Sequence, residues 1–245
     1  MLSLLNIIPM PEGMSLLPAA AAAILTAVIA YLLGSINPAI IITRICIHKD
    51  IRDFGSGNAG MTNVLRTVGL IPGIITFICD IAKGVIAVIL GGLLFTYLGG
   101  YANPQLGAYT AGIFVMAGHL FPIYYHFKGG KGISTYAGIL AVIDWRVMVI
   151  GLSIFLIILL ITKYVSLGSI FAAISTPIST FVLHTVANTS PFSDQVWDTV
   201  FSLILAAVTV AMHHENIKRL IHGNERKITV KLPGKSKKDS TETPQ

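Results

Sequence analysis

Apolar residues fill long stretches of the chain, and short polar segments separate them. The stretch at 151–162, GLSIFLIILLIT, is apolar on every side of a helix, whereas the strands of a membrane barrel alternate apolar and polar positions. A straight membrane helix needs roughly 17–25 apolar residues, and a broken helix needs fewer. The pattern therefore predicts an all-α, polytopic membrane helical bundle. The expected spans are 17–43, 70–97, 106–126, 132–143, 147–162, 165–187 and 198–214.

The stretch at 132–143 is too short to cross a bilayer alone. We expect it to be a half-helix, or to lie where protein lines a thinned region. Seven crossings is the expected count, and five or six are the alternatives. The predicted organisation is an N-terminal extension at 1–16, one membrane domain at 17–227, and a basic, polar tail at 228–245 for which we expect disorder.

Composition narrows the class of protein. Of the 245 residues, 54% are hydrophobic and only 11% are charged. A soluble domain usually carries about 25% charged residues. A soluble enzyme and a nucleic-acid-binding module are therefore excluded, and we expect no nucleic-acid partner. Cys46 and Cys79 have no short spacing that would suggest a disulfide framework or a metal site, so we expect both to be packing residues.

The basic residues are distributed unevenly about the predicted spans. The chain has 17 Lys and Arg against 11 Asp and Glu. With seven crossings, Lys83 lies inside a span, Arg146 lies on one face, and the other basic residues lie on the opposite face. The positive-inside rule then places the N-terminus outside and the C-terminus in the cytoplasm. An even number of crossings would put basic clusters on both faces.

The first polar loop on the basic side has an unusual composition. Residues 55–63, GSGNAGMTN, contain three Gly, two Asn, one Ser and one Thr. Glycine allows backbone N–H groups to approach an anion closely, and such a run before a helix forms an anion-binding nest. Arg66 shares a face with Asn63 if a helix has begun by Thr62. The alternative is a flexible glycine turn with Thr62 as a helix N-cap, and no G-K-[ST] follows that would make a Walker loop.

Two further segments on the same side carry candidate chemistry. Residues 127–135, FKGGKGIST, place two lysines and three glycines directly before an apolar helix, which indicates either an anion site or a membrane anchor with a glycine turn. In 212–227, helical spacing puts His213, Asn216 and Arg219 on one stripe. A single interfacial His is often only structural. Together, the segments indicate a phosphate-binding surface.

Polar residues also interrupt the spans. Ser35 and Asn37 break the first span, and Asp80 and Lys83 are three residues apart on a helix. Buried charges in a bilayer cost about 2.5–3.5 kcal/mol each on insertion scales, so they are candidates for function. We favour the simpler interpretation that Asp80 and Lys83 neutralise each other locally. His119 either lines the same cavity or bonds a carbonyl of a broken helix.

These motifs resemble one family, the bacterial acyl-phosphate:glycerol-3-phosphate acyltransferases, over nearly the whole chain. The resemblance implies seven membrane helices in a bacterial inner membrane, a cytoplasm-facing active site, and no metal or cofactor. It implies transfer of an acyl group from acyl phosphate to the 1-hydroxyl of glycerol 3-phosphate, giving lysophosphatidic acid and phosphate, as the first step of phospholipid synthesis. A cytosolic enzyme that makes acyl phosphate is an implied partner. The motifs are at 34–44, 50–66, 79–84, 118–122, 127–135 and 213–225.

The resemblance also implies roles for particular residues. The catalytic group is His213, Asn216 and Ser35. The phosphate-binding group is Arg44, Ser56, Gly57, Asn58, Gly60, Thr62, Asn63, Arg66, Lys128, Gly129, Gly130, Lys131, Gly132 and Thr135. The supporting group is Asp80, Lys83, His119, Arg219 and Glu225. The chain departs from the family pattern at Met61, where Ala is usual, and at 133–135, Ile-Ser-Thr, where Val-Ala-Thr is common.

Acyl phosphate is already an activated mixed anhydride, and the sequence shows no strong nucleophile constellation, so we expect direct attack by the acceptor hydroxyl. His213 acts as the general base in this scheme, or a substrate phosphate takes the proton and His213 only binds. The alternative function is a membrane transporter or channel for an organic phosphate. Against it, the polar groups gather on one face. A purely structural membrane protein does not account for three such segments.

Overall fold

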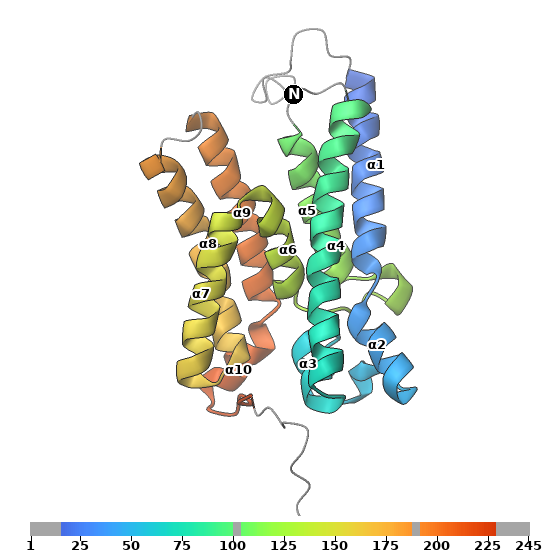
Figure 1. Ribbon diagram of the computed structural model, residues 1–245, viewed down its shortest axis with the longest axis vertical. Helices are drawn as coiled ribbons and strands as arrows, with labels where there is room; N and C mark the ends of the chain where they lie inside the picture. Colours follow the sequence, from blue (N-terminus) through green and yellow to red (C-terminus); the bar gives the residue numbers. More distant parts are fainter. Residues whose placement is uncertain (1–15, 100–103, 188–191, 229–245) are drawn as a thin grey trace, which may run out of the picture.

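The computed structural model describes residues 16–99, 104–187 and 192–228, and these contain helices and no strand (Figure 1). The predicted all-α bundle is therefore confirmed. Apart from Leu16 and Ile228, the N-terminal extension and the basic tail lie outside the described residues. The long helices are α1 (Leu16–Ser35), α4 (Leu70–Tyr97), α5 (Gln105–Leu120), α6 (Ile133–Ile143), α7 (Trp145–Thr162), α8 (Val165–Ala187) and α9 (Phe192–Ala211). The short ones are α2 (Pro38–Ile47), η2 (Ile51–Asp53), α3 (Met61–Thr67), η3 (Ile123–Tyr125) and α10 (His214–Ile221).

The structure has fewer complete membrane crossings among its described residues than the seven expected spans. Among the described residues, five segments are long and apolar enough to cross a membrane: Leu17–Ile47, Leu70–Tyr97, Gln105–Tyr125, Trp145–Thr162 and Val165–Val186. A sixth forms if Val196–Ala211 and His214–Ile221, bent by 58°, make one span. The short α6, which corresponds to the seventh expected span, runs opposite to α5 and α7 (Figure 1). The protein is thus multi-pass, and seven is only an approximate count.

Local chemistry ends α1 and begins α2. Pro38 occupies the first turn of α2, and the Asn37 side chain accepts a hydrogen bond from the Ile40 amide at 3.1 Å. Proline tolerates this position because its missing N–H would have no helical partner there. The break turns the chain away from α1 and leads α2 toward the polar end of the bundle (Figure 1).

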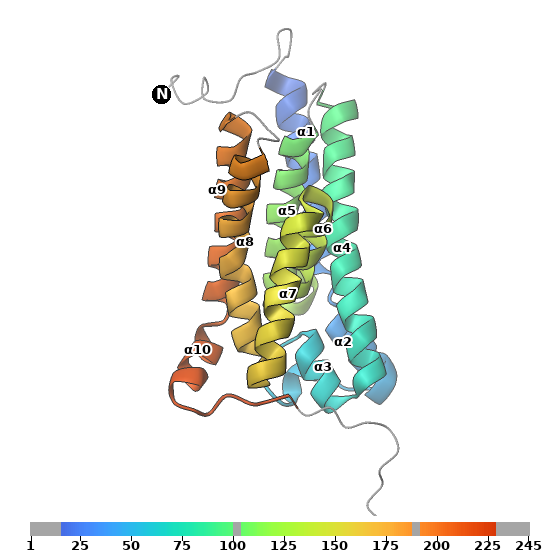
Figure 2. The ribbon, with the colours of Figure 1, turned by 60° about the vertical axis from the view of Figure 1, so that its left-hand side comes forward.

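Glycines allow α1 to approach α5 closely and α4 to approach α6 closely. A side chain at Gly34 would collide with the Val115 carbonyl, which fixes the contact of α1 with α5. A side chain at Gly138 would collide with the Ile81 carbonyl, and one at Gly84 with the Thr135 carbonyl, so α6 packs directly on α4. Small residues at such crossings let helix backbones meet in a membrane. As a result, α6 lies between the α1–α4–α5 group and the α7–α8–α9 group (Figures 1 and 2).

Candidate active site

A cavity of about 830 Å³ lies between α3, α4, α6, α7, α8 and α10. Its polar end is lined by the first glycine loop with α3, the start of α6, and the α10 region. Its apolar part continues along α6, α7 and α8. The polar lining includes Ser56, Asn58, Thr62, Asn63, Arg66, Lys131, Ser134, His213, Asn216, Arg219 and Glu225, and the apolar lining includes Phe77, Leu140, Met148, Leu152, Phe155, Leu156 and Leu159.

Asn63 organises the first glycine loop. Its side-chain amide donates to the carbonyls of Ile51, Phe54 and Asn58 at 2.9–3.1 Å, and its Oδ1 accepts from the Ser56 amide at 3.2 Å. Gly55 and Gly57 have φ angles of 59° and 71°, which side chains rarely adopt. The loop backbone thus takes up the hydrogen-bonding groups of Asn63, although its side chain also lines the cavity, and its role in binding phosphate stays a prediction.

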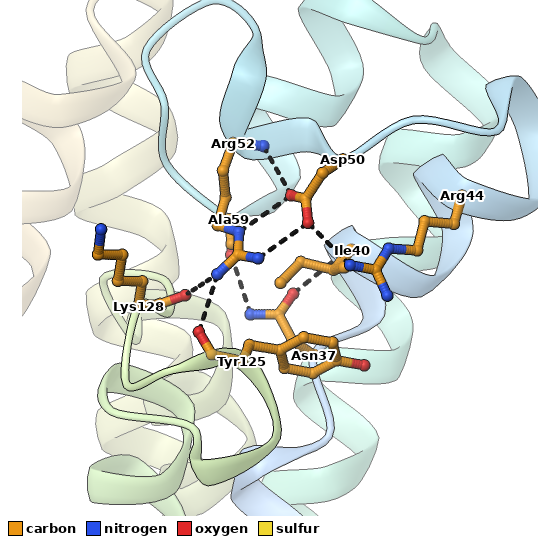
Figure 3. Close-up of polar contacts among 8 residues, drawn as sticks. All are labelled: Asn37, Ile40, Arg44, Asp50, Arg52, Ala59, Tyr125 and Lys128. Atoms are coloured by element: carbon orange, nitrogen blue, oxygen red, sulfur yellow. Dashed lines mark hydrogen bonds and ion pairs between the residues drawn. The ribbon is translucent and has the colours of Figure 1, made fainter.

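Arg52, in η2 just before the first glycine loop, links this region to the loop at 125–128 (Figure 3). Asp50 accepts from Arg52 and from Arg44, and Arg52 also donates to the Tyr125 carbonyl at 2.8 Å and the Lys128 carbonyl at 3.5 Å. The hydrogen bonds from Arg52 lower the pKa of Asp50 to about 2. Sequence reasoning missed Arg52, and its signal was the Asp-x-Arg spacing after α2.

Two predicted phosphate ligands, Arg44 and Lys128, belong to this cluster and do not line the cavity. The Arg44 side chain is 54% exposed and pairs with Asp50, and Lys128 takes part through its carbonyl (Figure 3). Ser35 is buried at the helix break, where it donates to the Tyr31 carbonyl at 2.9 Å and accepts from the Ile123 amide at 3.4 Å. None of these three residues lines the cavity.

The second loop presents Lys131 to the cavity. Gly130 donates to the His119 carbonyl and Gly129 to the Leu120 carbonyl, and Gly132 turns the chain into α6 with φ 86°. The Lys131 ammonium donates to Asn216 Oδ1. Burial lowers the pKa of Lys131 to about 8, and the neighbouring arginines at 66 and 219 contribute to the shift. The ammonium is therefore poised to gain from an anionic ligand.

The third segment contributes a histidine and a carboxylate-centred network. His213 Nδ1 lies 2.8 Å from the Thr209 carbonyl, so it carries the proton in the neutral ring and leaves Nε2 as an acceptor. Glu225 accepts from Asn216 at 2.9 Å, Arg219 at 2.8 Å and Ser166 at 3.0 Å. Burial opposes ionisation of Glu225, but these hydrogen bonds hold its pKa below the usual value. Ser166, one of several hydroxyl residues in α8, was not predicted.

Arg66 closes the polar end of the cavity. Its Nη2 donates to the Arg226 carbonyl at 2.9 Å, while its Nε is buried without a hydrogen-bond partner among the described residues. With Lys131 and Arg219 it faces one carboxylate, that of Glu225, so positive charge predominates. This arrangement suits an anionic group such as phosphate.

The structure brings most of the predicted residues together. The cavity wall includes Ser56, Asn58, Gly60, Thr62, Asn63, Arg66, Asp80, His119, Lys131, Gly132, His213, Asn216, Arg219 and Glu225. Outside it lie Ser35, Arg44, Gly57, Lys83, Lys128, Gly129, Gly130 and Thr135. Asp80 and Lys83 form the expected local ion pair, with Asp80 Oδ1 2.8 Å from Lys83 Nζ. Met61 and Ser134, two of the departures from the family pattern, also line the cavity.

Comparisons with known proteins point to one family. The family model described as glycerol-3-phosphate acyltransferase matches residues 24–223. The glycerol-3-phosphate acyltransferase of Thermoanaerobacter sp. (strain X514) is 44% identical over 206 residues, which cover 84% of this chain and 96% of the relative. That of Clostridioides difficile (strain 630) is 39% identical over 205 residues, covering 84% and 95%.

Solved structures are also similar. The crystal structure of PlsY (YgiH), an integral membrane glycerol 3-phosphate acyltransferase, in its glycerol 3-phosphate form has a TM-score of 0.71 and 32% identity, covering 84% of this chain and 96% of that chain. The lysophosphatidic acid form has a TM-score of 0.67 and 31% identity, covering 84% and 95%. The resemblance seen in the motifs is confirmed, and the chain belongs to the glycerol-3-phosphate acyltransferase family.

Proposed function

We propose that this membrane glycerol-3-phosphate acyltransferase takes its acyl group from acyl phosphate and transfers it to the 1-hydroxyl of glycerol 3-phosphate, giving lysophosphatidic acid and phosphate. The observation that carries the proposal is the composition of the cavity, where a cationic end continues into an apolar channel. A donor with a charged phosphate and a long apolar chain matches both parts. The similar solved structures carry glycerol 3-phosphate and lysophosphatidic acid, which supports the acceptor and the product.

The proposed reaction is a direct attack. The acceptor oxygen forms a bond to the acyl carbon, the bond from that carbon to the phosphate oxygen breaks, and phosphate leaves with the electron pair. Arg66 and Lys131, which line the cationic end of the cavity, stabilise the departing charge. No covalent enzyme intermediate is needed, because the donor is already activated.

The proton of the attacking hydroxyl needs an acceptor. The free Nε2 of His213 provides one, since Thr209 holds the proton on Nδ1. Asn216 then orients substrate, held by Glu225 on one side and Lys131 on the other. The competing route sends the proton to a substrate phosphate oxygen and leaves His213 a binding role.

The proposed orientation places the polar end of the cavity in the cytoplasm. The segments that carry most basic residues are α2, η2, α3, the 126–132 loop, the α7–α8 turn and α10, and they lie at one end of the bundle (Figures 1 and 2). Arg146 follows α6 toward the other end. The positive-inside rule therefore supports a cytoplasmic site, which a cytosolic enzyme making acyl phosphate can supply.

Detergent-purified protein mixed with palmitoyl phosphate and glycerol 3-phosphate tests the proposal. We expect phosphate release that requires both substrates and yields lysophosphatidic acid in equal amount. Phosphate release without glycerol 3-phosphate would instead indicate hydrolysis of the donor. Turnover with acyl-CoA or acyl carrier protein, but not with palmitoyl phosphate, would overturn the proposed donor while leaving the family assignment intact.

A further inference from the structure

Three titratable side chains are buried together beside the cavity, outside the three loop segments that carry the proposed chemistry. Asp80 and Lys83 come from α4 and His119 from the end of α5, and they are 2%, 5% and 3% exposed. Asp80 Oδ1 lies 2.8 Å from Lys83 Nζ and 3.3 Å from His119 Nδ1. Both nitrogens therefore lie within ion-pair distance of one carboxylate oxygen. Charges buried at this depth are costly unless paired, so their placement needs an explanation beyond local neutralisation.

Lys83 reaches the break between α1 and α2. In a continuous helix the Ile40 amide would donate to the Ile36 carbonyl, but here it donates to the Asn37 side chain. Lys83 Nζ instead donates to the Ile36 carbonyl at 3.0 Å. Asn37 in turn donates to the Ala59 carbonyl at 3.4 Å (Figure 3), and Ala59 belongs to the first glycine loop. The ammonium thus supports the backbone that holds this loop.

His119 reaches the second glycine loop. Its Nδ1 also lies 3.2 Å from the Thr135 hydroxyl in the first turn of α6, and its carbonyl accepts from the Gly130 amide at 3.2 Å. Its ring packs so closely against Gly130 that a side chain there would collide with Nε2. The ring therefore fixes the position of the loop that presents Lys131 to the cavity.

We propose that Asp80 is a positioning residue, which holds Lys83 and His119 so that the two glycine loops, 55–60 and 129–132, keep a fixed separation across the phosphate end of the cavity. Lys83 fixes the first loop through the helix break, and His119 fixes the second. The loops then present Arg66 and Lys131 to the same substrate. This role rests on the proposed function, in which these loops bind phosphate groups.

The test compares two double variants that each remove one acid–base pair completely. D80N/K83M removes the cluster charges, so that neither variant residue leaves an unpaired buried charge. The control is D144N/R146M, because Asp144 and Arg146 form a more exposed acid–base pair with the same 2.8 Å separation, at the other end of α6. For both, we would measure kcat and KM for glycerol 3-phosphate, the melting temperature in detergent, and hydrogen exchange of the loop amides.

We expect D80N/K83M to lose about 10- to 100-fold in kcat/KM, since small displacements of binding groups have effects of this size. Exchange should accelerate in 55–60 and 129–132 and stay unchanged in the helices. D144N/R146M should keep kcat/KM and loop exchange, whatever its melting temperature. Unchanged kinetics and loop exchange in D80N/K83M, or accelerated exchange throughout the bundle, would overturn the positioning role.

A histidine pair refines the test. Asn places its amide nitrogen where His has Nδ1, so H119N can still donate to Asp80, whereas H119Q cannot. We expect H119N to retain most of the loop protection that H119Q loses, and equal losses would contradict the proposal. Wild-type protein without turnover on palmitoyl phosphate would overturn the proposed donor, but the exchange measurement would still decide the role of Asp80.

Discussion

At the residue scale, the Lys131 ammonium has the environment of a ligand for phosphate. It is largely buried, donates to Asn216, and has the cations of Arg66 and Arg219 nearby. Folding lowers its pKa from 10.5 to about 8, so folding favours the neutral form between these two values. The charged Lys131 side chain therefore destabilises the folded state below about pH 8, and this destabilisation decreases as the pH rises toward 10.5. A bound phosphate would offset the penalty.

This shift predicts a pH dependence of substrate capture. In wild-type protein, kcat/KM for glycerol 3-phosphate should fall as the pH rises through about 8, because the free enzyme loses the ammonium charge. K131R should keep a lower but flatter profile over this range, since arginine stays protonated. A pH–rate series with both proteins measures the difference. Identical profiles would show that Lys131 does not set this limb.

His213 gives a second prediction at this scale. If Nε2 is the general base, H213Q should lower kcat by about 10²–10⁴-fold and should remove the low-pH limb of the rate profile. The limb disappears because no imidazole remains to be protonated. Stopped assays over the acidic range decide the point. A surviving limb in H213Q would transfer the base role to a substrate phosphate.

Substitution of Asn63 should lower the stability of the protein, because this side chain orders the first glycine loop. N63A removes four hydrogen bonds that order the first loop. At a net value of about 1 kcal/mol for each bond, the loss should be roughly 2–4 kcal/mol, and substrate binding should weaken with it. Thermal unfolding in detergent measures the loss. N58A is the comparison, because its side chain lines the cavity, and it should affect KM more than stability.

At the element scale, local patterns predicted most of the helices. The expected spans at 70–97 and 165–187 coincide with α4 and α8, and the short span at 132–143 with α6, because apolar runs mark all three and glycines precede α4 and α6. Glycine loops before α3 and α6 were also predicted. The contacts of Ser35 and Arg44 were not, because tertiary partners decide them: Ser35 accepts from the Ile123 amide at the helix break, and Arg44 pairs with Asp50.

Because α4 and α6 cross closely, we expect a substitution at Gly138 to destabilise the bundle. In G138A, the new methyl group would collide with the Ile81 backbone, which cannot rotate away, so α6 has to shift. The expected cost is about 1–3 kcal/mol, typical of overpacking. G151A is the matched control in α7, because its methyl group would meet the Thr176 side chain at an ordinary 3.5 Å. Comparable melting temperatures for the two variants would contradict the packing argument.

At the scale of the whole molecule, one cavity combines a polar, cationic end with an apolar part. Its polar end is lined by segments far apart in the sequence, α3, the loop before α6, and α10. Of these, α3 and α10 lie at the same, basic end of the bundle (Figure 2). Its apolar part follows α7, whose outer side chains such as Leu160 and Ile161 are exposed, as expected for contact with lipid. An acyl chain can therefore stay in an apolar environment while its phosphate meets the cations. Family membership, together with this layout, favours the acyltransferase over an organic-phosphate transporter.

The orientation of this layout is testable at the two ends of α7. Trp145 is 64% exposed at its start and Lys163 is exposed beyond its end. In a background with Cys46 and Cys79 replaced by serine, a membrane-impermeant maleimide should label W145C in intact cells and K163C only after permeabilisation. The charge distribution is the reason, since a single span separates Arg146 from the basic end. The reverse pattern would place the phosphate end outside the cell, away from any cytosolic source of acyl donor, and the proposed supply of substrate would fail with it.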